Sequence, residues 1–505
     1  MSSWPDAVTF AQSWASAVAA RPNASFLVFE APDGTVTEWT YGEFDAIVGS
    51  VATELVSHNV GSGVAVHVAL TNCPTFVAVW IAATRLGAWI VPSDPIGRTP
   101  ELADHIGRTA PVVGFCSRDR AAAYEPAARG IPMFHIDETD ASFAWLPAER
   151  FTAWPEPALT DRAAVMFTSG TTGRPKGVEI TQANYAFAGK TMAGAAELTP
   201  HDRQLVVLPL FHANAQYYSF ASAIWAGASV ALMHTFSASG FLPQAARHKA
   251  TCASLFAAPL RMILARGGPV DGLALRHCWF AQNITPDQYD TVSEWFGCAP
   301  RQLYGMTETI PAVLTDAPEQ PDCSSMGYVT GGCEVEIHDA AGSRLDAGEI
   351  GEIVVGGDRG ITLFAGYLDD PTTTEASFRG DWFLTGDRAS RNTEGRFYFD
   401  GRRSDVLKVA GENVSTVEVE AVVTAHPAVL EASVVGAPDP VRDEVPVAFV
   451  VAADPASPPS VDELTAWCTE RLGKAKVPRE FTILDELPRT SVGKIRKFLL
   501  KEAVR

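Results

Sequence analysis

The 505-residue sequence predicts an α/β protein with a large N-terminal domain of mostly parallel β-sheets and covering helices, followed by a small, mobile C-terminal α+β domain. Three observations support this prediction. Apolar runs of strand length alternate with helical segments along most of the chain, which is typical of parallel sheets. The pattern of the sequence changes from about residue 404. A chain of this length also exceeds one ordinary hydrophobic core, so at least two domains are expected.

A first βαβ unit is predicted over residues 64–95. Residues 64–70, VAVHVAL, form an apolar run with the length of a buried strand. Residues 74–87 predict a helix because the segment opens with a proline and closes on Gly87. The next strand is expected in AWIVPSDP, at residues 88–95. The order strand, helix, strand indicates a parallel pair.

A second group of apolar segments predicts the same kind of sheet further along the chain. Strands are expected at residues 203–211, RQLVVLPLF, and 227–233, GASVALM, on either side of an apolar helical stretch. Near the N-terminus, Thr40 stands three residues before Glu43. This is the spacing of a capping box, which satisfies the first N–H groups of a helix, and we assign the pair a structural role only.

The C-terminal domain is predicted from the change of pattern after residue 404. A charged helix, two strands and their turns lead to a link rich in Pro and Ser at residues 453–460, and a further helix follows. A unit of about one hundred residues is a common domain size. We therefore expect an N-terminal domain over residues 1–402 and a C-terminal domain over residues 403–505.

Charge and composition exclude several classes of partner. The chain has 39 Lys and Arg against 59 Asp and Glu, and its net charge of −20 repels nucleic acids and anionic membranes. Its eight cysteines contain no Cys-x-x-Cys pair. No run reaches the roughly 18 apolar residues of a membrane span, and the N-terminus has no pattern of a signal peptide. We expect a cytoplasmic protein with no nucleic-acid partner and no integral membrane segment, whose oligomeric state stays open.

The segment FTSGTTGRPKGVEIT, at residues 167–181, has the composition of an anion-binding loop. An apolar strand precedes it, its glycines let backbone N–H groups converge on an anion, and Arg174 and Lys176 add positive charge. Such a loop suits a polyphosphate. The spacing differs from that of a GxxxxGK[ST] loop, and no Ser or Thr follows Lys176, so another nucleotide-binding geometry is expected.

TSGTTGRPKG resembles the signature phosphate loop of the adenylate-forming superfamily, which includes acyl-CoA synthetases, adenylation domains of peptide synthetases and beetle luciferases. The segments that resemble the other family motifs, in the family's order and at about its spacing, are YGMTET (304–309), TGD (385–387), GRRSDVLKVAGENVSTVEVE (401–420) and PRTSVGK (488–494). The resemblance covers the chain from about residue 40 to the C-terminus. It implies that a carboxylic acid and ATP form an acyl-adenylate, and that a thiol then displaces AMP. ATP, Mg²⁺ and coenzyme A are the implied cofactors.

The resemblance also implies roles for individual nucleotide-site residues. Tyr304 would stack on adenine, Thr307 would hydrogen-bond the α-phosphate, and Glu308 would bind Mg²⁺, a hard cation that prefers oxygen ligands. Asp387 would accept hydrogen bonds from both ribose hydroxyls, and Arg402 would make a second ribose or phosphate contact. The residues implied to hold the β- and γ-phosphates are Thr168, Ser169, Gly170, Thr171, Thr172, Gly173 and Lys176.

The C-terminal motifs imply a catalytic lysine and a hinge. Lys494 occupies the family's catalytic position, where a lysine bridges the substrate carboxylate and the α-phosphate, so it joins Thr307 and Glu308 as a candidate catalytic residue. Ser404 stands at the hinge position, where relatives usually carry Asp or Lys, and its small side chain tolerates a backbone change. The positions implied to serve thioester formation are Lys408 and Gly411.

The acyl pocket departs from the family pattern. Residues 209–227 match the segment that gates the acyl site, which makes His212 a candidate, with a packed core histidine as the alternative. Asn283 lies in an Ala-Gln-Asn turn where most relatives have a Gly-Gly-Ala-type turn, and Trp225 adds apolar bulk. The FHANAQYY segment also resembles carnitine- and crotonobetaine-CoA ligases. We expect a largely hydrophobic acid, such as a polycyclic or terpenoid acid of secondary metabolism.

Other activities stay open at this point. The leading interpretation is an ATP-dependent acid:CoA ligase. A stand-alone adenylation enzyme that loads a carrier protein is the alternative. We expect no fused carrier domain in this chain, so the acceptor would be a free molecule in either case. A regulator that has lost catalysis would be expected to lack Lys494 or Glu308, and both are present. A luciferase-like monooxygenase would share every motif, and oxygen-dependent light emission would distinguish it.

Overall fold

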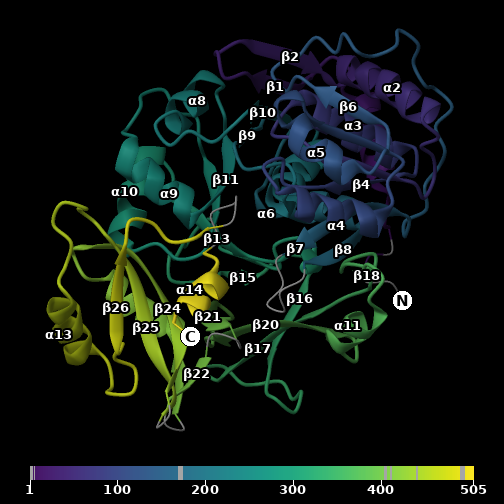
Figure 1. Cartoon of the computed structure of the whole chain (residues 1–505). Helices are drawn as coiled ribbons and strands as arrows, with labels where there is room; N and C mark the ends of the chain where they lie inside the picture. The colour runs from purple at the N-terminus through teal and green to yellow at the C-terminus, as the bar shows by residue number, and fades with distance from the viewer. Residues whose placement is uncertain are drawn as a thin grey trace. The chain divides into compact units, whose positions relative to one another are not determined.

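The computed structural model describes residues 4, 6–168, 175–402, 406–409, 412–439, 442–489 and 495–504. The chain divides into two compact units, Met1–Glu334 with Val355–Phe383, and Val335–Val354 with Leu384–Arg505. The division passes through strands β17 (Ile350–Gly356) and β20 (Trp382–Arg391) (Figure 1). The expected boundary after residue 402 stays a prediction, and Ser404 lies outside the described residues.

The first unit contains a nine-stranded sheet whose central six strands are parallel. Antiparallel strands flank them on both sides. In spatial order, the strands are β15 (Tyr328–Val329), β14 (Leu314–Thr315), β13 (Arg301–Tyr304), β12 (His277–Ala281), β11 (Cys252–Phe256), β9 (Arg203–Val206), β10 (Ser229–Met233), β1 (Ser25–Glu30) and β2 (Val36–Thr40). This sheet confirms the predicted α/β class with a mostly parallel sheet.

The first unit also contains a seven-stranded sheet, which includes the two strands that flank the phosphate loop. Its five parallel strands are followed by two antiparallel ones. In spatial order, they are β6 (Met133–Ile136), β5 (Val113–Ser117), β3 (Ala65–Ala69), β4 (Trp89–Pro92), β7 (Arg162–Thr168), β8 (Lys176–Thr181) and β18 (Gly366–Tyr367). Strands β3 and β4 are parallel neighbours joined by helix α3 (Pro74–Arg85), which confirms the βαβ unit predicted over residues 64–95.

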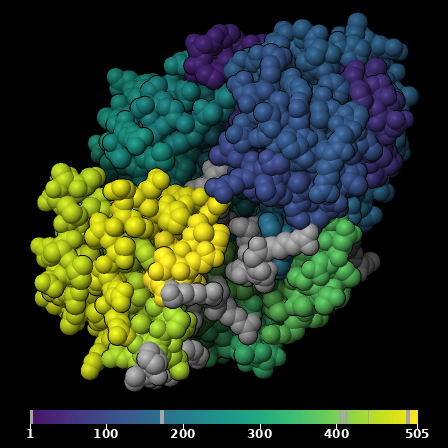
Figure 2. All heavy atoms as spheres, in the orientation of Figure 1, coloured from purple at the N-terminus to yellow at the C-terminus, as the bar shows by residue number. Residues whose placement is uncertain are grey.

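Helices cover these strands. Helix α2 begins at the predicted capping box, in which Thr40 and Glu43 each bond the other's backbone N–H. Figure 2 shows in blue the surface of the part of the chain that contains α4 and α5, and strands β3 and β5 of the same sheet are fully buried. The helices of this unit are α1 (Phe10–Ala20), α2 (Tyr41–Ser57), α3, α4 (Thr99–Thr109), α5 (Ala121–Ala128), α6 (Gln182–Ala195), α7 (Ser222–Ala226), α8 (Phe241–Arg247), α9 (Ala257–Arg266), α10 (Pro286–Phe296) and α11 (Pro371–Ala376), with short 3₁₀ turns η1 (Arg118–Arg120) and η3 (Thr307–Thr309).

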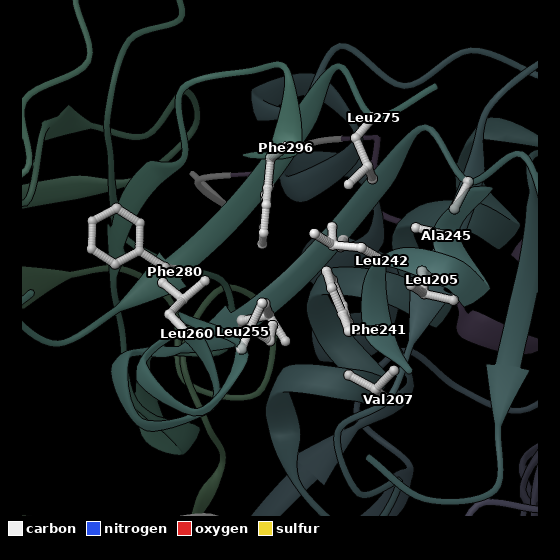
Figure 3. Packing of buried hydrophobic residues seen from close by; sticks show 14 of the residues in the cluster. Leu205, Val207, Phe241, Leu242, Ala245, Leu255, Leu260, Leu275, Phe280 and Phe296 are labelled. Carbon is white, nitrogen blue, oxygen red and sulfur yellow. The ribbon is translucent and has the colours of Figure 1, made fainter. Parts of the chain in front are cut away.

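One hydrophobic core lies between the nine-stranded sheet and helices α8, α9 and α10 (Figure 3). The rings of Phe241 and Phe296 stack at 5.6 Å, and Leu255 and Phe280 are fully buried beside them. Each such side chain stabilises the fold by roughly 1.5–3 kcal/mol. Leu255 is followed by the last residue of β11, and Phe280 by the last residue of β12, so this core holds the carboxyl ends of both strands in place.

Two predicted elements differ from the structure in extent and type. The strand expected over residues 203–211 ends at Val206 as β9. Further along, the Asn72 side chain donates to the carbonyl of Leu208 and accepts from the N–H of Leu210, so this backbone pairs with a side chain instead of a strand. The helical stretch that follows is a π-helix, η2 (Asn214–Ala221), continued by α7.

The second unit has its own sheet and core. The order β23-β22-β25-β24, with β26 beside β25, comprises β23 (Glu412–Ser415), β22 (Val406–Val409), β25 (Asp443–Ala452), β24 (Val429–Asp439) and β26 (Glu480–Leu484). Its helices are α12 (Thr416–Thr424), α13 (Val461–Arg471) and α14 (Lys497–Ala503). The order α12, β24, β25, α13 confirms the predicted helix, two strands and helix. Val434, Val450 and Leu464 are fully buried in this core.

A further sheet has the order β16-β17-β20-β19, with β21 beside β20. Its remaining bounds are β16 (Glu334–His338), β19 (Phe378–Arg379) and β21 (Phe397–Arg402). All eight cysteines fall in the described part of the chain and are free thiols. Within the same ranges, the helices are too short or too polar to cross a membrane.

Candidate active site

Four adjacent parallel strands, β13, β12, β11 and β9, present their carboxyl ends at the same end of the nine-stranded sheet. Tyr304 is the last residue of β13, Asn283 lies in the turn after β12, and His212 follows β9. Ligands of parallel α/β sheets bind at the carboxyl ends of strands. The topology therefore brings one predicted nucleotide-site residue and two predicted acyl-site residues to the same end of this sheet.

Strands β7 and β8 flank the predicted phosphate loop. They are antiparallel, and Thr168, the last residue of β7, stands opposite Lys176, the first residue of β8. The pairing holds the two ends of the loop side by side. The loop positions that lie outside the described residues are Ser169, Gly170, Thr171, Thr172, Gly173 and Arg174.

Lys176 and Glu308 both contact Tyr367, a residue that the sequence analysis did not indicate. The Lys176 ammonium lies 4.5 Å from the centre of the Tyr367 ring, a cation–π distance. The Tyr367 hydroxyl donates a hydrogen bond of 3.0 Å to the Glu308 carboxylate. Tyr367 reaches this place because β18 pairs with β8, with Tyr367 opposite Val178. A cation and a carboxylate are thus joined through one ring.

Electrostatics keeps the Tyr367 hydroxyl a donor. Burial raises the pKa of Tyr367, and the neighbouring Glu308 carboxylate raises it further, because a second negative charge beside the first is unfavourable. Glu308 is itself buried, with 5% of its surface exposed, in the short turn η3. The fully buried residue Ile310 follows this turn with φ at 73°, a left-handed conformation that is rare for a β-branched residue. Strained backbone of this kind is often found at functional sites.

The donor set around Glu308 suits Mg²⁺. A carboxylate oxygen is the ligand type that this hard cation prefers, and the cation usually keeps waters and binds substrate phosphates as well. Across the described ranges, His, Cys, Asp and Glu side chains do not gather in threes as a metal site. A cation held by one carboxylate together with ATP phosphates needs no such cluster.

The π-helix η2 packs against both nucleotide motifs. The Tyr217 hydroxyl lies 3.9 Å from the Met166 sulfur on β7. A Cβ atom at Gly305 would lie 3.0 Å from the Tyr218 hydroxyl and 2.9 Å from a backbone carbonyl, so only glycine fits between η2 and this motif. π-Helical turns are frequent at functional sites. His212 precedes this helix, half-buried, with its ring 4.2 Å from that of Phe211.

The turn after β12 is held from two sides. The Gln302 side chain donates a hydrogen bond of 2.8 Å to the carbonyl of Gln282, and Arg261 donates one of 2.6 Å to the carbonyl of Asn283. Gln282 has φ at 75°, a conformation that glycine adopts without strain. Gln282 therefore holds a backbone conformation that glycine favours, although the turn contains no glycine. The side chains of Gln282 and Asn283 are exposed.

Trp225 lies away from these residues. It stands near the end of α7, and its ring packs 6.3 Å from that of Trp4. Helix α7 ends shortly before Ser229, the first residue of β10, so Trp225 stands near the amino end of strand β10. The structure does not bring it to the carboxyl end of the sheet, where His212 and Asn283 lie.

The second unit holds the predicted ribose residues. Asp387 on β20 and Arg402 on β21 stand opposite each other, and Arg402 Nε donates a hydrogen bond of 3.0 Å to the Asp387 carboxylate. Asp387 is buried, while half of the Arg402 side chain is exposed. Gly386 has φ at 74°, which lets the chain turn directly before Asp387. Lys494 and Gly411 lie outside the described residues, as does the Lys408 side chain on β22.

Tyr367 is the site residue that sequence reasoning missed. It stands in LFAGYLDDP, in which a glycine precedes it and an acidic pair and proline follow. That pattern indicates the end of a strand and a turn. It carries no information on the partner strand, and Tyr367 touches Lys176 only because β18 pairs with β8.

Comparisons with known proteins agree with this geometry. The family model described as AMP-binding enzyme matches residues 14–368, and the model of the AMP-binding enzyme C-terminal domain matches residues 418–494. The chain is 33% identical to the crotonobetaine/carnitine–CoA ligase of Salmonella choleraesuis (strain SC-B67), over 97% of this chain and 98% of that relative.

Two solved structures extend the similarity to the fold. The o-succinylbenzoate CoA synthetase of Bacillus subtilis, in complex with its acyl-adenylate intermediate, is similar with a TM-score of 0.84 and 30% identity, over 97% of both chains. ATP-bound MatB from Rhodopseudomonas palustris is similar with a TM-score of 0.89 and 25% identity, over 98% of this chain and 99% of that one.

Proposed function

This chain belongs to the AMP-binding enzyme family, and we propose that within it the chain joins a mainly hydrophobic carboxylic acid to coenzyme A. As an AMP-forming acyl-CoA synthetase, it uses ATP, Mg²⁺ and CoA and forms an acyl-adenylate. The contact between Lys176, Tyr367 and Glu308 is the observation that supports the ATP site, because it sets a cation and the carboxylate proposed to bind Mg²⁺ beside the phosphate-loop strands.

In the first step, the carboxylate of the acid attacks the α-phosphorus of ATP, and pyrophosphate leaves. Two anions approach each other, so positive charge and N–H donors must offset their repulsion. Lys176 would stabilise the β- and γ-phosphates, Thr307 would donate to the α-phosphate, and Lys494 would bridge this phosphate and the attacking carboxylate. Glu308 would hold Mg²⁺, which supplies further neutralisation of phosphate charge.

Two predicted residues would hold the nucleoside. Tyr304 at the end of β13 would stack on adenine, and Asp387 would accept hydrogen bonds from the ribose hydroxyls. The ion pair supports this role, because Arg402 orients the buried Asp387 carboxylate.

In the second step, the thiolate of CoA attacks the acyl carbon, and AMP leaves. We propose that the C-terminal domain, residues 403–505, turns about a hinge near Ser404 between the two steps, because one orientation cannot serve both. Lys494 would act in the first orientation, and Lys408 and Gly411 in the second. These roles rest on the family motifs.

The proposed acid is mainly hydrophobic. Phe211 and His212 form a half-buried aromatic pair at the carboxyl end of the sheet, and the buried π-helix η2 follows them in the chain. Pockets for organic acids are mostly apolar with a few polar groups. His212 and Asn283 would supply those polar groups, and Trp225, which packs against Trp4, is left out of this proposal.

A pyrophosphate-release screen tests the function. A panel of carboxylic acids is incubated with MgATP, without acceptor, with CoA or with a phosphopantetheinylated carrier protein. We expect hydrophobic acids to release pyrophosphate and to form the CoA thioester. Thioester formation on the carrier alone would assign the acyl group to a carrier protein, and release with polar acids only would refute the proposed substrate class.

Separating the half-reactions tests Lys494. The substitution Lys494→Ala should slow adenylation by roughly 10² or more, since it removes a cation that acts while the carboxylate attacks phosphorus. Thioester formation from presynthesised acyl-adenylate and CoA should be nearly unchanged. Gly411→Leu should show the opposite pattern in a single turnover. Equal slowing of both half-reactions by Lys494→Ala would contradict the two-orientation scheme.

A further inference from the structure

One face of helix α4 contacts the residues on both sides of the phosphate loop. The His105 ring lies parallel to that of Phe167, at 3.9 Å and 5°. One turn later, Arg108 lies with its guanidinium carbon 4.8 Å from the centre of the same ring. Arg108 also donates a hydrogen bond of 2.7 Å to the carbonyl of Pro175. Phe167 lies on β7 before the loop, and Pro175 directly precedes β8 after it.

His105 is fixed in place by a buried network. Its Nδ1 lies 2.8 Å from the Ser93 hydroxyl, which lies 3.0 Å from His67 Nε2, and Tyr124 contacts the other nitrogen of His67. Burial lowers the pKa of His105 to about 4 and that of His67 to about 3. Both imidazoles are therefore neutral at pH 7, and α4 presents a fixed, uncharged ring to Phe167.

Arg108 is connected to the catalytic side of the site through Pro175. The carbonyl that it binds belongs to the residue directly before Lys176, so the bond fixes the peptide from which Lys176 extends. Lys176 then lies over Tyr367, whose hydroxyl binds Glu308. A continuous series of contacts runs from helix α4 to the carboxylate proposed to hold Mg²⁺.

The charges of Arg108 and Lys176 also act on one carboxyl group, that of Asp370. Hydrogen bonds from Thr373 are the main reason that the pKa of Asp370 is lowered, and the charges of Lys176 and Arg108 lower it further. The two cations therefore lie near the same carboxyl. Arg108 also pairs with the Asp104 carboxylate at 3.5 Å, so its charge is partly compensated and its hydrogen bond to Pro175 carries the argument.

We propose that Arg108 is a positioning residue of the ATP site, which holds the Pro175–Lys176 peptide so that the Lys176 ammonium meets the β- and γ-phosphates. This role rests on the proposed function of Lys176. Arginine suits it because its planar guanidinium bonds a carbonyl in a fixed direction while lying against an aromatic ring. The stack of His105 on Phe167 holds the opposite strand, so α4 sets the spacing of both loop ends.

Equilibrium binding of two nucleotides tests the proposal without knowledge of the acid. MgATP and AMP are titrated into the full-length protein and into Arg108→Ala. AMP lacks the β- and γ-phosphates, so the variant should bind MgATP about 10-fold more weakly, as expected for the loss of a charge-assisted hydrogen bond, and AMP within about 2-fold of wild type. Arg108→Lys keeps the charge without the planar donor, and its affinity for MgATP should lie between those of wild type and Arg108→Ala.

Two controls separate positioning from a general structural effect. Arg118→Ala removes an exposed arginine paired with Asp137 at 3.7 Å and should leave both affinities unchanged. In a Lys176→Ala background, Arg108→Ala should weaken MgATP binding by less than about 2-fold, because Arg108 acts through Lys176.

The possible outcomes decide the proposal. An equal loss of MgATP and AMP affinity, or a full 10-fold loss in the Lys176→Ala background, would overturn it. If Arg108→Ala does not fold, the ratio of MgATP to AMP affinity in Arg108→Lys decides in the same way. A wild-type protein that binds MgATP with this dependence on Arg108, yet forms no acyl-CoA from any acid, would refute the proposed function and leave the role of Arg108 intact.

Discussion

The group formed by Lys176, Tyr367 and Glu308 and the pair formed by Asp387 and Arg402 are built in different ways. The group takes its three residues from β8, β18 and the η3 turn, and its hydroxyl and carboxylate are buried. The pair takes its residues from opposite positions of two neighbouring antiparallel strands, and half of the Arg402 side chain is exposed. The pair depends on the register of one strand pairing, whereas the group depends on two sheets being assembled.

This difference has consequences for function. The group contains Lys176 of a phosphate-loop strand and Glu308, the metal-binding candidate, so its loss should act on ATP through the β- and γ-phosphates. The pair is proposed to hold the ribose, which ATP and AMP share. The ratio of MgATP to AMP affinity should therefore distinguish the two regions, and each substitution below measures one side of the comparison.

The largest effect is expected from Glu308→Gln. The amide oxygen still accepts the hydrogen bond from Tyr367, but the negative charge proposed to hold Mg²⁺ is lost. Adenylation should slow by about 10³-fold, since phosphate charge is then poorly neutralised. Pyrophosphate release at saturating ATP measures this effect, and the exposed Glu319→Gln serves as a matched control. Full activity in excess chelator would contradict the assignment.

Asp387→Asn should have the next largest effect. The amide removes the charge paired with Arg402 and replaces one acceptor oxygen with a donor. The affinities for MgATP and AMP should both fall by roughly 10- to 100-fold, because hydrogen bonds to a charged group are strong. The exposed Asp381→Asn is the control. A loss of affinity confined to MgATP would indicate that Asp387 acts on the phosphates instead of the ribose.

The buried histidines beside the phosphate loop predict a loss of stability in acid. Because the pKa values of His67 and His105 in the folded protein are about 3 and 4, only the unfolded chain binds these protons between about pH 6.5 and pH 4. The free energy of unfolding should fall as the pH falls through this range, by up to about 1.4 kcal/mol per pH unit for each histidine. Urea denaturation at pH 7, 6 and 5 measures the slope, and His105→Asn should reduce it. An equal slope in this variant would show that His105 does not contribute.

The smallest effect is expected from Tyr367→Phe. The ring stays available to Lys176, and only the hydroxyl that binds Glu308 is removed. A single hydrogen bond to a carboxylate, at the lower end of its usual range, corresponds to roughly 10-fold in adenylation kcat/KM for ATP. AMP affinity should not change. If AMP affinity falls as much as ATP affinity, the group does not act through the phosphates, and the comparison between the two regions no longer holds.

Patterns along the chain predicted much of the first unit. The apolar runs that became β3, α3 and β4 were predictable because their periodicity reflects burial within one segment. The end of β9 was not, because the Asn72 side chain takes the place of a partner strand at Leu208 and Leu210. The π-helical form of η2 was also missed, since packing against Met166 and Gly305 is not visible in its own residues.

For the candidate site, the sequence by itself determined which segments carry the nucleotide chemistry, because contiguous residues such as those at 304–309 keep their spacing wherever the segment folds. Only the tertiary structure decided that Tyr367 joins Lys176 to Glu308, that Arg108 binds the carbonyl before Lys176, and that Trp225 packs against Trp4. These contacts arise from strand pairing and burial between distant segments, and the separation of such segments along the chain leaves no periodic or local signal.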